Sequence, residues 1–378
     1  MVVFGTRPEA TKMAPVIREL QRHPQMEPIV TVTAQHREML DQVLEHFQLP
    51  VHHDLDVMRP RQSLTEVTVR VLQGLEDVLA AERPDVVLVH GDTATTGAAA
   101  LAAFYARIPV GHVEAGLRTY RKYEPFPEEM FRRITDIIAD VHFAPTRHAR
   151  DNLLAERIPA GDIFVTGNTV IDALLMTVRD DYVFQTPGLA EILAAGRRVL
   201  AVEAHRRENW GAPMHDICRA LRRVLDARDD VSLVYSVHQN PEVAGVVTRH
   251  LAGHPRAHLF SPPLDYPEWA NLMARCAFVV TDSGGLQEEA PALGKPVLLL
   301  RNTTERPEAV AAGTVQQVGT DPDAVTAAVL RLLDDAGAYR AMATARNPYG
   351  DGQAARRTVA GLACWLGLTA ERPDEWEA

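Results

Sequence analysis

Ser283, Gly284 and Gly285 form a polar turn between an apolar run that predicts a buried strand and residues 286–293, which predict a helix. We expect Ser283 to cap that helix, and the two glycines let backbone N–H groups approach a phosphate closely. Glu289 lies one turn into the helix, where a carboxylate suits sugar hydroxyls better than phosphate. Together these residues predict a site for a nucleotide sugar.

Three carboxylates in the first half of the chain, Asp92, Glu114 and Glu128, have spacing that suits acid–base chemistry. Asp92 and Glu114 end strands that we expect to be neighbours, so both can point to one edge of a sheet. Like charges that share a dry site raise one pKa, as general acid–base catalysis requires. The alternative is that Asp92 caps the next helix and Glu128 is a first-turn charge. Spacing alone leaves both interpretations open.

Basic residues stand where they could hold the anionic part of a ligand. Arg7 directly follows the first predicted strand, and we expect it to reach phosphate. Lys12, inside the following helix, is expected either to contact the ligand or to pair with Glu9 or Glu114. We expect Arg306 near ribose and phosphate; the alternative is an arginine paired with its neighbouring glutamate on a solvated turn.

Two histidines, His205 and His238, end predicted strands in the second half of the chain. A lone histidine is more often an ordinary polar residue than a catalyst. Here Arg206 follows His205 and makes a cationic edge, so we expect this segment to contact phosphate. His238 begins a similar turn at a strand end and is expected to contact the ligand as well.

The elements that must position these residues are apolar strands that alternate with amphipathic helices. This alternation predicts an α/β protein with parallel sheets that are covered by helices on both faces. In such sheets ligands sit at the carboxyl ends of the strands, and the polar clusters lie there. The strands are predicted at residues 2–4, 28–33, 85–89, 110–113, 141–144, 163–165, 199–202, 232–236, 278–281 and 297–300.

The length of 378 residues predicts two domains. We place an N-terminal Rossmann-like domain with the acid–base residues at 1–168 and a C-terminal Rossmann-like domain that binds the nucleotide at 169–352. Residues 353–378 contain a helix that is expected to cross back to the first domain. The polar edges of the two sheets are expected to face a cleft, with a hinge at residues 167–186.

Composition limits the classes of function. The chain is 46% hydrophobic and 24% charged, as in ordinary soluble globular proteins. Its net charge of -11 argues against a nucleic-acid partner. No apolar run approaches the roughly 18–20 residues of a membrane span, and no signal peptide precedes Val2, so a cytoplasmic enzyme is expected. The three cysteines lack metal-ligand spacing, so no metal is expected.

Taken together, the polar clusters resemble the non-hydrolysing UDP-N-acetylglucosamine 2-epimerases, which have the GT-B fold of two Rossmann-like domains. The resemblance runs from residue 2 to about residue 356 and rests on an ordered set of motifs. These are GTRPEATKMAP, VEAGLR, PFPEE, HRREN, DSGG and TERPE. One such segment would be weak evidence, but the ordered set is very specific.

The resemblance implies a reaction that inverts C2 of the sugar and interconverts UDP-GlcNAc and UDP-ManNAc, with no cofactor. Loss of UDP from C1 would give enzyme-bound 2-acetamidoglucal, and UDP would re-add after protonation of C2 from the other face. A homodimer is the expected assembly. The catalytic residues implied are Asp92, Glu114, Glu128 and His205. The substrate- and UDP-binding residues implied are Arg7, Lys12, Arg206, His238, Ser283, Gly284, Gly285, Glu289 and Arg306.

Bacterial members of this family can bind a second UDP-GlcNAc as an activator. The matching positions in this chain are Gln35, Arg61, Glu128, Arg206 and His238. Glu38 stands at another family position that is often glutamine, and its charge would repel a diphosphate. Activation by UDP-GlcNAc is therefore an expectation that depends on how strongly Glu38 opposes it.

Other functions share part of this pattern. A GT-B glycosyltransferase that uses a UDP-sugar would have the same nucleotide site, but the N-terminal carboxylates and Arg7 favour an epimerase. A hydrolysing 2-epimerase would release free ManNAc and UDP. A catalytically silent nucleotide-sugar sensor would not need all three carboxylates. Product identity separates these alternatives.

Overall fold

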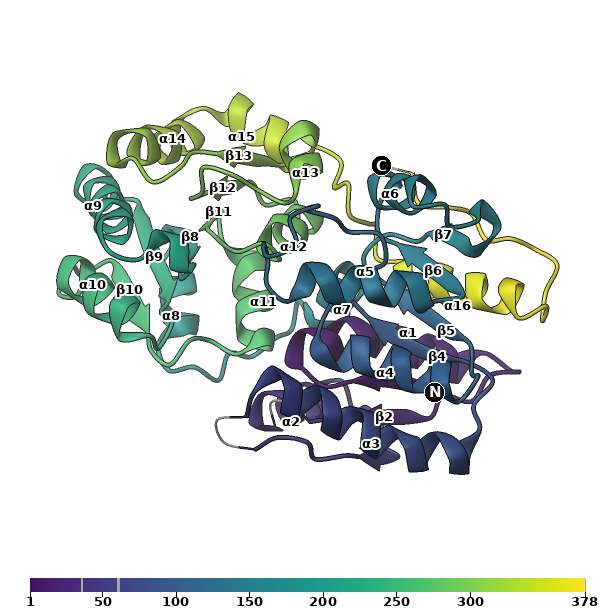
Figure 1. Cartoon of the computed structure of the whole chain (residues 1–378). Helices are drawn as coiled ribbons and strands as arrows, with labels where there is room; N and C mark the ends of the chain where they lie inside the picture. The colour runs from purple at the N-terminus through teal and green to yellow at the C-terminus, as the bar shows by residue number, and fades with distance from the viewer. Residues whose placement is uncertain (35–36, 60–61, 378) are drawn as a thin grey trace. The chain divides into compact units, whose positions relative to one another are not determined.

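The computed structural model describes residues 1–34, 37–59 and 62–377. The chain forms two compact units, Met1–Leu175 with Tyr349–Ala378, and Met176–Pro348 (Figure 1). Each unit is built on one sheet, and every strand pair in the described residues is parallel. The predicted α/β class with parallel sheets and helices is therefore confirmed.

The first unit has a seven-stranded sheet in the order β3-β2-β1-β4-β5-β6-β7. The chain passes from β1 to β2 and then to β3 at one edge of the sheet. It returns to β4 on the other side of β1, so the strand order reverses between β1 and β4. Ligands bind at such a switch point in open α/β sheets. The strands are β1 Val2–Phe4, β2 Val30–Val32, β3 His53–Asp54, β4 Val87–His90, β5 Val110–Val113, β6 Val141–Ala144 and β7 Ile163–Val165.

The helices of the first unit fall into two groups. Helices α3, α4 and α5 pack side by side, while α1 packs against α2 and α16 (Figure 1). Helix α16 also contacts β6 and β7, so the end of the chain is part of this unit. The bounds are α1 Arg7–Arg22, α2 Arg37–His46, α3 Leu64–Glu82, α4 Ala94–Tyr105, α5 Glu128–Ile138, α6 Arg147–Ala155, α7 Thr169–Thr177, which runs into the second unit, and α16 Ala354–Trp365.

The second unit repeats this plan with a six-stranded sheet in the order β10-β9-β8-β11-β12-β13. Its switch point lies between β8 and β11. The strands are β8 Arg198–Glu203, β9 Val231–Ser236, β10 Ala257–Phe260, β11 Phe278–Thr281, β12 Val297–Leu299 and β13 Val315–Gln317. The helices are α8 Leu189–Ala194, α9 Ala212–Ala227, α10 Pro241–Leu251, α11 Tyr266–Arg275, α12 Leu286–Ala292, α13 Pro307–Ala312, α14 Pro322–Asp334 and α15 Ala336–Ala343.

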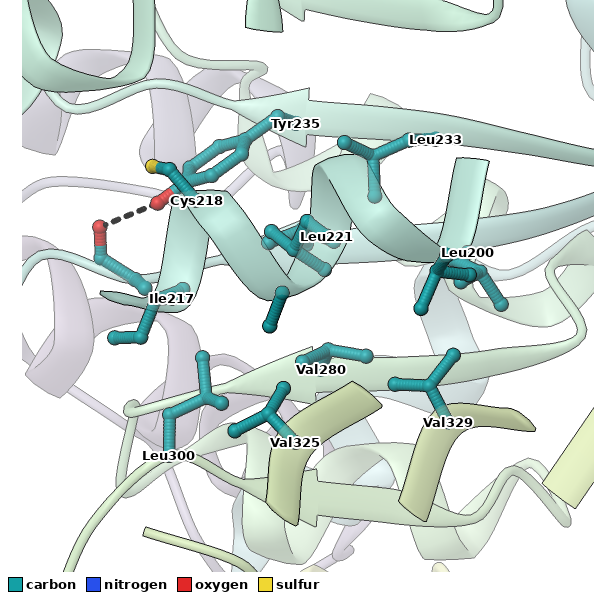
Figure 2. Packing of buried hydrophobic residues seen from close by; sticks show 14 of the residues in the cluster. Leu200, Ile217, Cys218, Leu221, Leu233, Tyr235, Val280, Leu300, Val325 and Val329 are labelled. Carbon is teal, nitrogen blue, oxygen red and sulfur yellow. Dashed lines mark hydrogen bonds between the residues drawn. The ribbon is translucent and has the colours of Figure 1, made fainter. Parts of the chain in front are cut away.

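The core of the second unit lies where α9 and α14 pack on the sheet. Figure 2 shows side chains of both helices meeting side chains of the strands, among them Leu221 of α9, Val280 of β11 and Val329 of α14. Tyr235 is fully buried in this cluster, and its hydroxyl donates to the carbonyl of Ala204 at 3.1 Å. A buried hydroxyl with a partner avoids the cost of an unsatisfied polar group. This core fixes the strand ends at the switch point.

Ten strands were predicted from the sequence. The described residues contain thirteen strands; β3, β10 and β13 were not predicted from the sequence. Within the same residues, no helix is long and apolar enough to cross a membrane.

Candidate functional site

Glu9 ties together the two turns at the switch point of the first unit. One carboxylate oxygen accepts from the backbone N–H groups of Gly5 at 3.0 Å and Thr6 at 2.8 Å. The other accepts from the hydroxyls of Thr93 at 2.6 Å and Thr96 at 2.9 Å. Burial raises the pKa of Glu9, although these four bonds oppose the shift. Glu9 is thus fully engaged in shaping the turns after β1 and β4.

Glu114 is the centre of the polar cluster in the first unit. Lys12 forms an ion pair with its Oε2, which is one of the pairings expected from the sequence. Asn168 donates to the same oxygen at 2.8 Å. Glu114 has a φ of 66°, in the left-handed region that a residue with a Cβ rarely adopts. Strained backbone of this kind concentrates at functional sites, where surrounding contacts hold it in place.

His90, the last residue of β4, lies beside Glu114 and was not predicted as a site residue. Its Nε2 is 3.7 Å from Oε2 of Glu114. The ring is 3% exposed, and neither nitrogen has a hydrogen-bond partner in the part of the chain that the structure describes. Burial lowers the pKa of His90 to about 4, although the charge of Glu114 opposes this. A neutral imidazole with both nitrogens unpartnered is unusual in a protein interior and marks a site that a ligand completes.

Asp92 is held by an arginine from the other side of the cluster. Arg132 of α5 donates to Oδ2 of Asp92 through Nε at 3.1 Å and reaches Glu129 through Nη1 at 3.2 Å. Asp92 does not cap the next helix, because Thr93 does so by accepting from the backbone N–H of Thr96. The capping alternative for Asp92 is therefore wrong. Arg132 was not predicted, although it follows Glu128 by one helical turn.

Glu128 is the first residue of α5, on the same helix as Arg132. Its Oε2 is buried and has no hydrogen-bond partner among the described residues. An unpaired buried carboxylate oxygen costs free energy unless a ligand satisfies it. Arg7, at the start of α1, is exposed. The predicted site residues of the first unit thus lie in the turns after β4 and β5 (Asp92 and Glu114), at the start of α5 (Glu128) and on α1 (Arg7 and Lys12).

In the second unit a buried aspartate shapes the loop after β8. Asp282 accepts from the backbone N–H groups of His205 at 3.0 Å and Arg206 at 2.9 Å. The side chain of Asn209 also donates to Asp282, at 2.9 Å. These bonds join the turn after β11 to the loop after β8 across the switch point. They hold two predicted site residues, His205 and Arg206, by their backbone.

The turn after β11 differs from the prediction in one respect. Helix α12 begins at Leu286 with Gly285 as its N-cap and no side-chain cap, so the prediction that Ser283 caps it is wrong. Gly285 directly precedes the first helical residue, so Ser283 lies two residues too early to be the N-cap. The backbone N–H of Ser283 donates to the hydroxyl of Thr281 at 2.9 Å, and its carbonyl accepts from Gln287 at 3.2 Å. Ser283 therefore belongs to the turn itself.

Arg306 lies directly against this turn. Its Nε donates to Glu288 at 2.6 Å and its Nη1 to Glu305 at 2.8 Å. A Cβ atom on Gly284 would lie 2.6 Å from Nη1 of Arg306, so only glycine lets the guanidinium approach this closely. Arg306 therefore pairs with Glu305, which was the alternative expected from the sequence. It also lies against the turn of Ser283, Gly284 and Gly285, where phosphate binding was expected.

The carboxylate of Glu305 is surrounded by cations. Burial alone would raise its pKa, but Arg306 and Arg301 lower it to about 2. Nη2 of Arg206 also lies 3.9 Å from this carboxylate. Because Glu305 stays ionised, it can hold these arginines in fixed positions. Three arginines, Arg206, Arg301 and Arg306, therefore lie around one carboxylate beside the turn after β11.

The two predicted histidines are brought together. The rings of His205 and His238 stack with centroids 5.2 Å apart and an interplanar angle of 17°. Nδ1 of His205 is 3.4 Å from Glu203, and Nδ1 of His238 accepts from the backbone N–H of Asn240 at 3.1 Å. Glu289 is buried, and its Oε1 would be 3.4 Å from a Cβ on Gly285. The predicted residues of this unit thus gather around one switch point.

Two of the predicted activator positions, Gln35 and Arg61, lie outside the described residues. Glu128 belongs to the first unit, and Arg206 and His238 belong to the second. Among the described residues, no group of three or more histidine, cysteine, aspartate or glutamate side chains could hold a metal ion. The predicted site residues that the structure describes therefore fall into two groups, one in each unit.

Comparisons with known proteins show which family this chain is similar to. A family model described as UDP-N-acetylglucosamine 2-epimerase matches residues 18–363. The UDP-N-acetylglucosamine 2-epimerase of Bacillus subtilis (strain 168) is 51% identical over 376 residues, which cover 100% of this chain and 98% of that protein. A co-structure of S. aureus MnaA with UDP has a TM-score of 0.91 and 45% identity, and covers 100% of this chain and 99% of that one.

A second solved structure contains a nucleotide sugar. UDP-GlcNAc 2-epimerase from Neisseria meningitidis bound to UDP-GlcNAc has a TM-score of 0.85 and 46% identity, and the match covers 96% of this chain and 98% of that one. These likenesses extend over both units. They confirm the predicted fold class of two Rossmann-like domains.

Proposed function

The chain belongs to the UDP-N-acetylglucosamine 2-epimerase family, and we propose that it interconverts UDP-GlcNAc and UDP-ManNAc without hydrolysis. The reaction would proceed by elimination of UDP to 2-acetamidoglucal and re-addition after C2 is protonated from the opposite face. The similarity to UDP-N-acetylglucosamine 2-epimerases supports epimerisation of UDP-GlcNAc. The non-hydrolysing course and the glucal intermediate are what the resemblance in the ordered motif set implies.

The observation that carries the proposal is the environment of Glu114. Two donors, Lys12 and Asn168, converge on one of its oxygens, and the unpartnered ring of His90 lies beside it. A carboxylate whose orientation is fixed in this way can take or return a proton at C2 of a bound sugar. No redox step is needed, because C2 loses a proton as UDP leaves and gains one on the opposite face as UDP returns.

We assign the remaining roles as follows. Asp92 and Glu128 would share the acid–base work with Glu114, since inversion requires proton transfer on two faces of the sugar. His205 would assist the departure of UDP. Arg206, His238, Ser283, Gly284, Gly285, Glu289 and Arg306 would hold UDP, together with Arg7 and Lys12 from the first unit. Preorganised donors of this kind stabilise the charge on a departing diphosphate.

Product analysis tests the proposal. Incubation with UDP-GlcNAc alone should give an equilibrium mixture with UDP-ManNAc, which NMR distinguishes by the configuration at C2. Release of free ManNAc and UDP would indicate a hydrolysing 2-epimerase. A product that forms only when a sugar or lipid acceptor is added would indicate a glycosyltransferase. We also propose that the enzyme acts in the cytoplasm and that it is a homodimer. Sedimentation analysis checks the homodimer.

A further inference from the structure

His112, in the middle of the first unit, connects the two turns that carry Asp92 and Glu114. It lies on β5 and is fully buried. Its Nε2 is 2.7 Å from the carbonyl oxygen of Gly91, the residue directly before Asp92. Its Nδ1 is 2.5 Å from Oδ1 of Asp136. One ring therefore contacts the turn after β4 and a carboxylate of α5.

Asp136 extends this contact to the second turn. Its Oδ2 accepts from the backbone N–H of Gly116 at 3.2 Å and from Arg118 at 2.8 Å. Gly116 follows Glu114 by two residues in the turn after β5. Asp136 is buried, which alone would raise its pKa, but His112 and Arg118 lower the pKa to about 2. The carboxylate is thus ionised and acts only as an acceptor.

The hydrogen-bond roles of the ring follow from its partners. The carbonyl of Gly91 and the ionised carboxylate of Asp136 are both acceptors, so each nitrogen of His112 donates. Bonds to charged groups in a buried site are stronger than neutral ones and fix geometry closely. His112 and Asp136 therefore form a chain of bonds from one turn to the other.

The turn after β5 has a backbone conformation that needs such support. Glu114 has a φ of 66°, and Gly91 and Gly116 have φ values of 69° and 84°. A Cβ on Gly116 would lie 2.3 Å from the carbonyl oxygen of Ala149, so this turn is also closely confined. Residues in sparsely populated conformations persist only where the surroundings over-determine them.

We propose that His112 and Asp136 form a brace that positions the turns of Asp92 and Glu114 for proton transfer at C2. The two are positioning residues and touch no substrate. The inference rests on the proposed function, because it assigns the brace to that reaction. Asp136 lies on the helix that begins at Glu128, so the same brace joins all three predicted acid–base residues.

Three substitutions of His112 test the brace in the full-length enzyme. His112→Phe keeps the ring but removes both donors, and kcat is expected to fall by about 10²-fold, the effect of a misplacement near 1 Å. KM and the Kd of UDP are expected to stay unchanged. His112→Gln keeps a donor where Nε2 lies, towards Gly91, and should recover most of kcat. His112→Asn keeps a donor only where Nδ1 lies and should recover less.

His142→Gln is the matched control. His142 is also buried, lies opposite His112 in register on β6, and contacts the backbone carbonyl of Asp136 at 2.9 Å. It has no recorded bond to the turns of Asp92 or Glu114 within the described residues. We expect His142→Gln to lower the denaturation midpoint as much as His112→Gln does, with kcat unchanged.

The outcomes separate the brace from the proposed function. Wild-type protein that makes no UDP-ManNAc contradicts the proposed function. Wild-type turnover with normal kcat in folded His112→Phe contradicts the brace alone. If the phenylalanine variant does not fold, the other two decide: a kcat for His112→Gln above that of His112→Asn at equal stability supports the brace, and equal values overturn it.

Discussion

The three carboxylates that we propose for acid–base catalysis differ in what holds them. Lys12 and Asn168 orient Glu114, and Arg132 pairs with Asp92, whereas Oε2 of Glu128 has no partner in the described part of the chain. A paired carboxylate is already placed for its task, while an unpaired one gains most from a bound ligand. We expect all three carboxylates to be needed for turnover and to contribute little to the affinity for UDP.

The substitutions Asp92→Asn, Glu114→Gln and Glu128→Gln remove one ionisable group each and keep its shape. Each should lower kcat by at least about 10²-fold, the usual contribution of a general acid or base. The Kd of UDP should change much less, and calorimetry checks it. Glu76→Gln, an exposed site on α3, is the control. Near-normal turnover in any of the three would remove that residue from the mechanism.

His90 makes the stability of the protein depend on acid. Its pKa is about 4 in the folded state and 6.5 in an unfolded chain. As pH falls from 6.5 towards 4, the unfolded chain gains a proton there and the folded protein does not, so stability falls. At pH 4.5 the loss should be roughly 2 kcal/mol relative to neutral pH.

Urea unfolding of wild type and His90→Leu at pH 7 and pH 4.5 measures this effect. The variant lacks the titrating ring, so its stability should drop less between the two pH values. An equal drop in both proteins would show that His90 is not the buried neutral group inferred here. Comparison of the two proteins cancels the other groups that titrate in this range.

At the scale of elements, the sequence predicts strands well where both faces of the sheet are covered. The predicted bounds of β1, β5, β6, β7 and β11 agree with the structure. The three missed strands, β3, β10 and β13, are all at sheet edges. An edge strand is paired on one side only, so it can be short and polar, as in His53–Asp54. Its hydrophobic signal is correspondingly weak.

The candidate-site residues that directly follow strands were predicted from the sequence. Most of the side chains that pair with them were not. A polar residue directly after an apolar run can be recognised from the sequence alone, as with Glu114. Arg132 is 40 residues from Asp92 in the chain, and Asp136 is 24 residues from His112. Such pairs form only through the tertiary fold. Ser283 was misassigned for a local reason, because the N-cap is the residue directly before the helix, which is Gly285.

Asp172 is an example of a cap supplied by a different element. It lies on α7 and accepts from the backbone N–H groups of Ala354 at 3.1 Å and Ala355 at 2.8 Å, at the start of α16. Gln353, the N-cap residue, makes no side-chain bond of its own. Asp172→Ala should therefore lower the free energy of unfolding by about 1–2 kcal/mol. Asp172→Asn keeps one acceptor and should cost less.

Chemical denaturation with a kcat measurement tests this cap. Asp92 and Glu114 lie in the turns after β4 and β5, and Glu128 begins α5, so none of them is on α7 or α16 and kcat of the folded variants should remain normal. Equal stability of Asp172→Ala and wild type would show that α16 is held by its packing on α1, β6 and β7 without this cap.

At the scale of the whole molecule, the proposed activator site predicts a specific kinetic form. If a second UDP-GlcNAc favours the active state, rates should depend sigmoidally on UDP-GlcNAc. The reverse reaction from pure UDP-ManNAc should start slowly and accelerate when a little UDP-GlcNAc is added. Glu38→Gln should strengthen activation by removing a charge that repels diphosphate. Hyperbolic kinetics in both directions without a lag would show that this protein lacks the switch.

The central claim is that UDP leaves and returns while C2 loses and regains its proton. Incubation of UDP-GlcNAc with the enzyme in deuterated water, followed by NMR at C2, tests this most directly. Elimination and re-addition predict UDP-ManNAc with solvent deuterium at C2, and deuterium in the recovered UDP-GlcNAc as well. Conversion to UDP-ManNAc with the original hydrogen retained at C2 would contradict the account.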